Sequence, residues 1–293
     1  IGYTHFNEKE YEKSLQAFRK FINLESNKKN RPYNDALNRI GDCYFIQRDF
    51  STALSYYEEA SNTKTLGTDY SVFQKAIVKG LLKDYSGKIN TLQGLTKEFT
   101  SSEYKDDALY EIGQAYMMLD DNQKAIIAYD QLYKEYPNSQ LTKKALLQKG
   151  MLLYNDDEYD KAIETYKLVI VSYLNSEEAN TALEGLEKIY VQTNRVNEYT
   201  AYTETLGSKI KISIEKEDSL NYAAAERQYL YGNTKQAAIN FRQYLEQYPQ
   251  GNYNVKARYY LADSYYMLNE KDFALEEYKL LLKQVGNPYM EEA

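Results

Sequence analysis

The sequence is short of the residues from which proteins usually build disulfides, metal sites and nucleophilic sites. Its 293 residues include one cysteine, Cys43, and one histidine, His5. A single cysteine excludes an intrachain disulfide and leaves the redox compartment open. A histidine with no cysteine near it does not form a metal site of the usual type. We therefore expect His5 to have a structural role in a helix and Cys43 to be a packed thiol.

Proline, glycine and long apolar runs are also scarce. Only 4 Pro and 13 Gly interrupt the chain, which is typical of an all-helical protein. No run approaches the roughly 18 apolar residues of a transmembrane helix. The formal net charge is −7 with a pI of about 5.1, whereas a nucleic-acid-binding protein usually carries a basic face. These absences favour a helical protein that neither spans a membrane nor binds nucleic acid.

Catalytic motifs are absent as well. The sequence contains no glycine-rich phosphate loop, no HExxH and no GxSxG. The acidic turn at residues 156–160 lacks the glycine and the ligand spacing of a calcium loop. Paired carboxylates stand beside lysines on helix faces, where they form surface ion pairs. We therefore predict that the protein is not an enzyme and uses no cofactor or metal.

What the sequence does contain is a repeat, and Ala108–Pro137 is its clearest copy. This stretch has two apolar faces at helical spacing, separated by the polar hinge Asp120-Asp121-Asn122. A glycine inside a helix makes the helix less stable than an alanine would. We therefore expect Gly113 to lie where the two helices cross and a larger side chain would push them apart. Pro137 ends the unit because it cannot continue a helix.

A small residue marks the same place in most copies. The aligned positions are Gly2, Gly41, Ala76, Gly113, Gly150, Glu187, Ala225 and Ala262. The separations are 39, 35, 37, 37, 37, 38 and 37 residues. A near-constant period of this size is typical of stacked helix pairs, because one such pair cannot bury its apolar faces alone. The chain has 33 tyrosines and no tryptophan. In a repeat protein the tyrosine ring can fill the seam between two helices while its hydroxyl reaches the surface.

The order of small and aromatic residues resembles the tetratricopeptide repeat (TPR), as at Gly113, Tyr116, Ala125, Tyr129 and Pro137. The resemblance implies an all-α, right-handed α-solenoid of about eight helix-turn-helix repeats, with no activity of its own. Residues 1–206 hold repeats one to six, and the fourth and fifth match best. A possible joint covers 207–218, and 219–293 hold repeats seven and eight with a C-terminal tail. Because the sequence opens at Ile1 inside a helical pattern, we expect a segment of a longer protein.

Three repeats depart from the pattern. The first is truncated. In the third, Lys88 stands where an alanine should pack, and Gly87 and Gly94 weaken the second helix, so we expect looser packing or a bend there. In the sixth, Glu187 and Tyr199 replace small residues.

The resemblance also implies a binding groove, because the first helices of such repeats line the concave face. The implied groove residues are Asn38, Asp42, Phe45, Tyr110, Gln114, Met117, Leu147, Met151, Tyr154, Tyr222, Glu226, Tyr229, Tyr259, Asp263 and Tyr266. Aromatic residues and methionine are enriched at interface cores. We expect a partner protein or peptide, possibly with basic residues, although any one of these side chains could instead pack against neighbouring helices.

The implied groove does not resemble that of the chaperone cofactors, which grip a C-terminal carboxylate with Lys, Arg and Asn. The corresponding places hold Asn38/Asp42, Tyr110/Gln114 and Tyr259/Asp263. An acidic groove repels a carboxylate, so we exclude a chaperone adaptor.

Two passages, Phe241–Leu282 and Tyr129–Ile170, resemble bacterial cell-envelope TPR proteins more closely. These are the lipoprotein of the outer-membrane β-barrel assembly machine and the Tol-associated periplasmic coordinator. The resemblance implies a scaffold in the periplasm or at the inner face of the outer membrane, with the cytoplasm as the alternative. A second functional hypothesis is a sensor module that binds a signal peptide or small ligand for an adjacent domain. The sequence leaves the partner's identity and the oligomeric state open.

Overall fold

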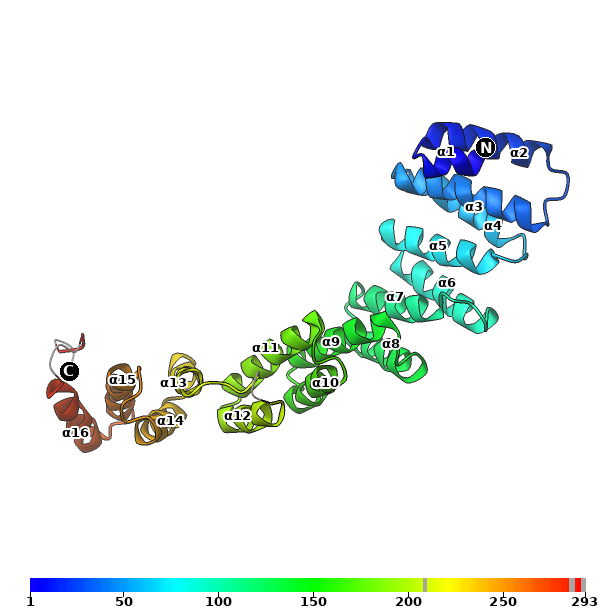
Figure 1. Cartoon of the computed structure of the whole chain (residues 1–293). Helices are drawn as coiled ribbons and strands as arrows, with labels where there is room; N and C mark the ends of the chain where they lie inside the picture. The colour runs from blue at the N-terminus through cyan, green and yellow to red at the C-terminus, as the bar shows by residue number, and fades with distance from the viewer. Residues whose placement is uncertain (208–209, 285–287, 291–293) are drawn as a thin grey trace. The chain divides into compact units, whose positions relative to one another are not determined.

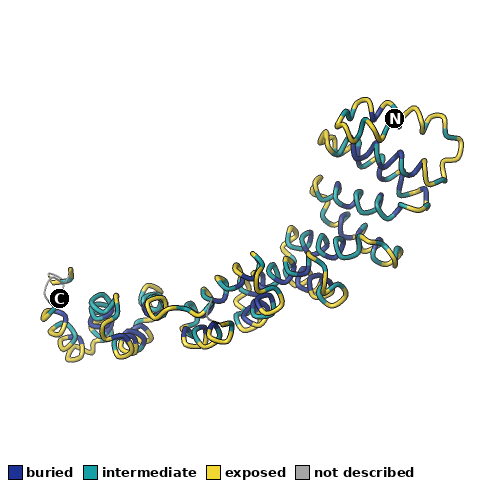
Figure 2. The backbone as a smooth tube through the Cα atoms, in the orientation of Figure 1, coloured by how far each residue is buried: buried dark blue, intermediate teal, exposed yellow. Residues whose placement is uncertain are grey.

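The computed structural model describes residues 1–207, 210–284 and 288–290. Throughout these residues the regular structure is helical, with sixteen α-helices and no strand (Figure 1). Within each compact unit, helices that follow one another in the chain pack side by side, and the buried residues lie between them (Figure 2). The predicted all-helical repeat is confirmed. No helix in the described ranges is long and apolar enough to cross a bilayer.

The chain divides into two compact units, Ile1–Glu158 and Tyr159–Ala293. The first unit contains α1 (Gly2–Asn7), α2 (Tyr11–Leu24), α3 (Arg31–Ile46), α4 (Phe50–Ser61), α5 (Thr68–Leu81), α6 (Tyr85–Glu98), α7 (Lys105–Met117), α8 (Asn122–Glu135) and α9 (Gln140–Asn155). The second contains α10 (Tyr159–Ser172), α11 (Glu177–Gln192), α12 (Val196–Thr205), α13 (Ile214–Leu230), α14 (Thr234–Gln247), α15 (Asn254–Met267) and α16 (Lys271–Leu282). Each odd-numbered helix is the first of a repeat and each even-numbered helix is the second.

The turn inside every repeat contains one residue in the left-handed conformation. These residues are Lys9, Arg48, Lys83, Asp120, Asp157, Asn194, Gly232 and Asn269, with φ between 57° and 75°. Each lies seven residues after the aligned small position, so the turns recur with the same period. Glycine, asparagine and aspartate tolerate this conformation better than lysine or arginine. One shared turn geometry therefore reverses the chain in all eight repeats.

An aspartate begins the second helix after several of these turns. The Asp49, Asp84 and Asp121 carboxylates each accept a hydrogen bond from the backbone N–H three residues on, at 3.1, 2.8 and 3.2 Å. Such a cap satisfies a backbone donor that the helix leaves unpaired and complements the positive end of its dipole. The polar hinge of the sequence is thus a left-handed residue followed by a helix cap.

The two helices of a repeat approach closely where the small residue lies. A β-carbon added to Gly113 would lie 2.3 Å from the Tyr129 ring, and one added to Gly41 would lie 2.7 Å from the Tyr57 ring. Ala125 of the second helix is fully buried. The predicted helix crossing at Gly113 is confirmed, and the tyrosine of the second helix fills the space that the glycine leaves.

The third repeat packs more tightly than expected. Lys88 lies with its stem against Gly80, and its ammonium pairs with Glu111 of the next repeat. Long basic side chains can cover apolar surface in this way while the charged end finds a partner. Leu92 and Leu95 on the same helix are fully buried. The first alternative, looser packing, is therefore wrong, and the bend stays a prediction.

The sixth repeat is the less regular one. Its second helix, α12, has 10 residues and no side-chain cap. Glu187 of α11 pairs with Lys216 of α13 at 2.7 Å, and Tyr199 is buried. The helix α13 begins at Ile214, inside the joint predicted at 207–218, because Ser213 caps it by accepting from the Lys216 N–H at 3.2 Å. Residues 208 and 209 of that joint, and 285–287 and 291–293 of the predicted tail, lie outside the described residues.

Neighbouring repeats are also joined by polar contacts at the start of the first helices. The Asp69 carboxylate accepts from Ser102 at 2.8 Å, and Asp106 accepts from Ser139 at 2.7 Å. In the second unit Asp218 accepts from the backbone N–H of Asn252 at 2.8 Å. Each acceptor lies near the start of one first helix and each donor lies in the loop before the next. These contacts set the spacing of repeats whose connecting loops are long.

We predict that Gly113→Ala lowers the free energy of unfolding by about 1–3 kcal/mol, because its β-carbon overlaps the buried Tyr129 ring. The matched control is Gly94→Ala, where a β-carbon meets nothing within 4 Å. That change should raise stability by about 1 kcal/mol through helix propensity. Urea unfolding followed by circular dichroism measures both. Equal stabilities for the two variants would contradict the placement of the seam.

Candidate functional site

The first helices of successive repeats contact one another within each unit. In the first unit α3 contacts α5 and α7 contacts α9, and in the second unit α13 contacts both α11 and α15. Stacked repeats form concave binding surfaces, and we expect the side on which first helices adjoin to be the inner one. We call this side of each unit the first-helix face. The predicted groove residues lie on these first helices, α3, α7, α9, α13 and α15.

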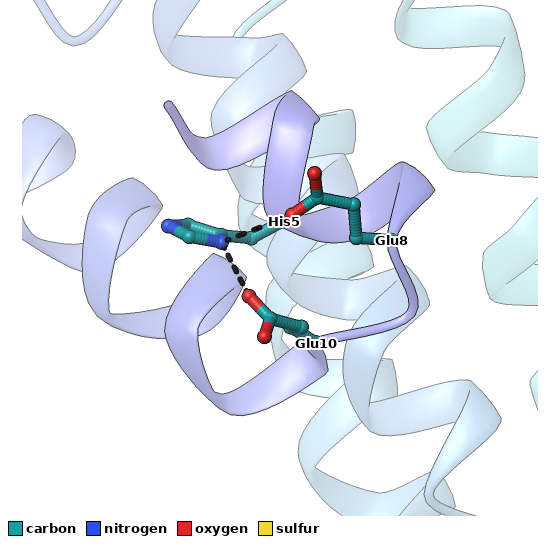
Figure 3. A group of neighbouring side chains, drawn as sticks. All are labelled: His5, Glu8 and Glu10. Atoms are coloured by element: carbon teal, nitrogen blue, oxygen red, sulfur yellow. Dashed lines mark hydrogen bonds and ion pairs between the residues drawn. The ribbon is translucent and has the colours of Figure 1, made fainter.

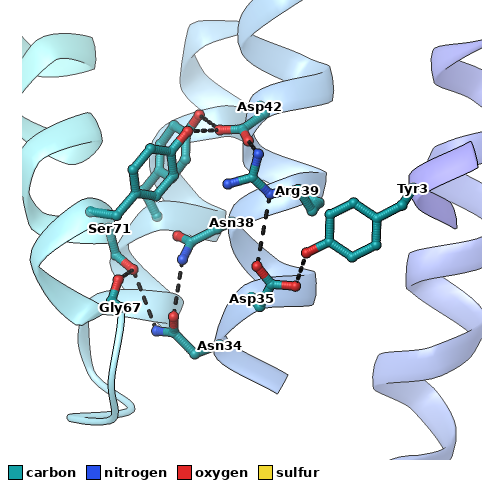
Figure 4. Close-up of polar contacts among 10 residues, drawn as sticks. Tyr3, Asn34, Asp35, Asn38, Arg39, Asp42, Gly67 and Ser71 are labelled. Atoms are coloured by element: carbon teal, nitrogen blue, oxygen red, sulfur yellow. Dashed lines mark hydrogen bonds and ion pairs between the residues drawn. The ribbon is translucent and has the colours of Figure 1, made fainter. Parts of the chain in front are cut away.

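The Asp42 carboxylate is the centre of a polar network on this face (Figure 4). Its Oδ1 accepts from the Tyr57 hydroxyl at 2.6 Å and from the Tyr70 hydroxyl at 2.7 Å. Its Oδ2 lies 2.6 Å from Nη1 of Arg39, which sits one turn earlier on α3. Asp42 is 7% exposed. The network therefore joins α3, α4 and α5 through one buried acid.

The ionisation of this group follows from its burial. Loss of hydration raises the pKa of the Asp42 carboxyl above its ordinary value, while Arg39 and the two hydroxyls act in the opposite direction. Burial is also the largest cause that raises the pKa of Tyr57 and Tyr70, followed by the charge of Asp42. Both hydroxyls therefore stay protonated and act as donors to the acid.

Asparagines extend the network along α3. The Asn34 side chain donates to the Ala60 carbonyl and to Thr63, both at 2.8 Å, and accepts from Asn38 at 3.0 Å. Asn38 is 3% exposed, and its Oδ1 has no hydrogen-bond donor among the described residues. Asn38 and Asp42 thus belong to a buried polar layer between repeats.

The second unit pairs its acids in a similar way. Tyr222 is 3% exposed, and its hydroxyl donates to Glu226 at 2.7 Å. Glu226 also pairs with Lys256 at 2.8 Å. The Asp263 carboxylate accepts a hydrogen bond from the Tyr229 hydroxyl. The acids of the first-helix face therefore already have partners within the chain.

The other predicted groove residues are more accessible. Tyr266 is 62% exposed and Met151 is 43% exposed. Half-buried side chains make up the rest of the predicted set: Phe45, Tyr110, Gln114, Met117, Leu147, Tyr154, Glu226, Tyr229, Tyr259 and Asp263. Gln114 donates to the Tyr129 hydroxyl at 3.0 Å, and that hydroxyl lies 3.2 Å from the Met117 sulfur. Contact of these residues with a partner stays a prediction.

His5 lies against two glutamates at the start of the chain (Figure 3). Its Nδ1 is 2.7 Å from Glu10 and 3.8 Å from Glu8, and the three possible ligand atoms lie within 4.8 Å of one another. Glu10 also pairs with Lys13, which is the largest cause that lowers the pKa of Glu10, ahead of His5. These contacts of His5, Glu10 and Lys13 are polar contacts of a solvated turn. Cys43 is fully buried beside Ser14, as expected of a packed thiol.

Comparison with known proteins finds a family match for part of the chain. A family model described as tetratricopeptide repeat matches residues 107–139 and 144–176. These two segments of the chain are therefore similar to the tetratricopeptide repeat. The two matches fall on the fourth and fifth repeats, where the sequence pattern is also the clearest. No curated protein matches the chain by sequence.

Solved structures share the all-helical fold of this chain at low sequence identity. Residues 41 to the end of MamA from Desulfovibrio magneticus RS-1 are 16% identical, with a TM-score of 0.50 over 60% of this chain and 93% of that chain. Another MamA structure is 16% identical, with a TM-score of 0.50 over 59% of this chain and 94% of that one. A TPR protein from Parabacteroides merdae ATCC 43184 is 14% identical, with a TM-score of 0.49 over 88% and 96%. At these identities the likeness to MamA shows the fold alone, and the envelope-type resemblance is not confirmed.

Arg39, Tyr57 and Tyr70 hold Asp42 in place, and the sequence analysis did not single them out for the site. The tyrosine of the second helix is part of the repeat pattern, but Tyr70 donates from the next repeat, 28 residues away. A tyrosine at that distance has many possible partners in a chain with 33 tyrosines. The available signal was an Arg and an Asp three residues apart on one helix, which predicts an ion pair.

We predict that Asp42→Ala lowers the free energy of unfolding by about 3–5 kcal/mol, because it leaves the largely buried Arg39 without its charge partner. The matched control is Asp35→Ala. Asp35 is half-exposed on the same helix and lies 4.0 Å from the same arginine, so its removal should cost less than about 1 kcal/mol. Thermal and urea unfolding of both variants measure the difference. A similar small loss for both would show that the network contributes little.

Proposed function

We propose that the chain is a non-catalytic scaffold that binds a partner protein or peptide on its first-helix face. TPR proteins bind protein or peptide partners, and such repeats are typically not catalytic. The observation that carries the proposal is the contact between first helices, of α3 with α5, α7 with α9, and α13 with α11 and α15. The predicted aromatic and thioether side chains lie on these helices. Exposed side chains of this kind, such as Tyr266 and Met151, desolvate well at an interface.

The sequence indicated that acids of this face would contact a basic partner directly, but in the structure they already have partners within the chain. Asp42, Glu226 and Asp263 already accept hydrogen bonds or ion pairs inside the chain. Direct salt bridges to a partner would have to replace those contacts. We therefore propose that rings and thioethers supply the contact, and that the net charge of −7 attracts a basic partner through its long-range field.

The test is selection of binders from a random peptide library displayed on phage, with the full chain as bait. We expect peptides that carry lysine or arginine, and we expect Tyr259→Ala with Tyr266→Ala to weaken their binding at least tenfold. These two tyrosines lie on α15, and Tyr266 is 62% exposed. Binding should also weaken as salt rises, because exposed charges are screened.

The matched control is Tyr231→Ala with Phe273→Ala. Both rings are exposed and lie outside the first helices, in a turn and on the second helix α16. The control removes the same number of rings, so it should bind as the parent does. Two outcomes would reject the first-helix face as the site. One is an equal loss of peptide binding in both double variants. The other is unchanged peptide binding by Tyr259→Ala with Tyr266→Ala when its circular dichroism spectrum matches that of the parent.

The cell envelope is our proposed location. The support is the resemblance of Tyr129–Ile170 and Phe241–Leu282 to envelope TPR proteins. Fractionation of cells that express the full-length gene product tests it. Recovery with the periplasm or outer membrane is expected, and recovery in the cytosol alone would overturn the proposal.

A further inference from the structure

A polar cavity of about 610 Å³ opens in the second unit, beside α12, α13 and α14. Its volume falls within the roughly 300–1,000 Å³ of small-molecule sites. Amide side chains dominate its lining: Asn194, Asn197, Asn221, Asn240, Gln243 and Gln247. The cavity lies where the sixth repeat departs from the pattern. It is far from the Asp42 network in the chain and shares no residue with the predicted groove.

Asn240 supplies a buried donor at this cavity. The residue is 5% exposed. Its Oδ1 accepts from the Asn194 side chain at 3.0 Å and from the Gln236 side chain at 2.8 Å. Its Nδ2 is buried and has no acceptor among the described residues. Buried polar groups nearly always have a hydrogen-bond partner, and at this cavity an acceptor oxygen of a ligand would supply one.

Asn221 supplies the complementary acceptor. Its Nδ2 donates to the Glu217 carbonyl at 3.0 Å and to the Tyr248 hydroxyl at 3.1 Å. The amide oxygen is therefore the group that Asn221 can offer to a ligand. Together, Asn240 and Asn221 present one donor and one acceptor. Gln243 and Gln247 are exposed and add further amides at the rim.

The charges of the cavity do not suit an anion. Arg195 is the cation in the lining, and it is held by Asp160 at 2.6 Å and by both oxygens of Glu198 at 2.7 and 2.8 Å. Glu246 adds a further negative charge at the edge. A phosphate or carboxylate would therefore meet net negative charge and an arginine already engaged by two acids.

Apolar surface is also limited in this cavity. The apolar side chains of its lining are Val196 and Tyr244, which are 3% and 2% exposed. The Tyr244 hydroxyl is occupied by Asp218. A peptide gains much of its affinity from side chains in apolar or charged pockets, and this lining supplies little of either.

We propose that the cavity binds a short, uncharged saccharide. Each sugar hydroxyl both donates and accepts, so neighbouring hydroxyls can pair with the Asn240 donor and the Asn221 acceptor together. The rim amides can pair with further hydroxyls in either role. This would give the chain a small-molecule site that is independent of its protein-binding face.

The test begins with the full chain on an array of neutral mono- to tetrasaccharides, followed by calorimetric titration with the saccharide that binds best. We expect Asn240→Asp to weaken binding at least tenfold. The change keeps the shape and both acceptor contacts of the side chain but removes the donor. The matched control is Asn180→Asp on the exposed surface of α11, which should leave the affinity unchanged.

A second variant covers the case in which Asn240→Asp does not fold. Gln243→Ala with Gln247→Ala alters exposed positions of α14 and should weaken binding several-fold with the helix content unchanged. A silent array would overturn the proposal. Saccharide affinity that is unchanged in the rim variant and in folded Asn240→Asp would also overturn it. So would the finding that Asn240→Asp abolishes the binding of displayed peptides and not of saccharides. None of these outcomes bears on the first-helix face, which is tested by different residues.

Discussion

The structure depends on how closely the two helices of a repeat can approach. In two repeats a glycine of the first helix faces a tyrosine ring of the second, in the pairs Gly41–Tyr57 and Gly113–Tyr129. The ring fills the seam, and its hydroxyl reaches back to the first helix, where it meets Asp42 in one repeat and Gln114 in the other. A single contact therefore closes the helix pair and also places a polar group on the first-helix face.

This arrangement decides what the first-helix face can offer a partner. The tyrosine hydroxyls and nearby cations satisfy the acids of the face, so its charged groups are largely committed to the fold. A buried carboxylate without such partners would be costly. What stays accessible is ring and thioether surface, as at Tyr266 and Met151. In the function that we propose, the requirements of stacking thus shift recognition from salt bridges towards desolvation of aromatic side chains.

The sixth repeat shows what happens where the seam pattern is lost. Glu187 and Tyr199 replace small residues, α12 has 10 residues, and a polar cavity lies beside it. In this cavity an amide donor of Asn240 has no acceptor in the part of the chain that the structure describes. Buried atoms without a hydrogen-bond partner among the described residues also occur in a regular repeat, as at Asn38 Oδ1. Beside the irregular repeat the polar side chains line a cavity, which is how a repeat protein can gain a second kind of site.

The sequence by itself determined the helical repeat, its period and the crossing at Gly113, because each repeat packs only on its neighbours and the same signals return every 35 to 39 residues. Tertiary structure decided the rest. The pairing of Lys88 with Glu111, the burial of Asn38 and Tyr222, and the contact between Asp42 and Tyr70 all depend on side chains from other helices. Helical spacing tells which face a residue occupies, but whether that face is open or covered depends on the neighbouring helices.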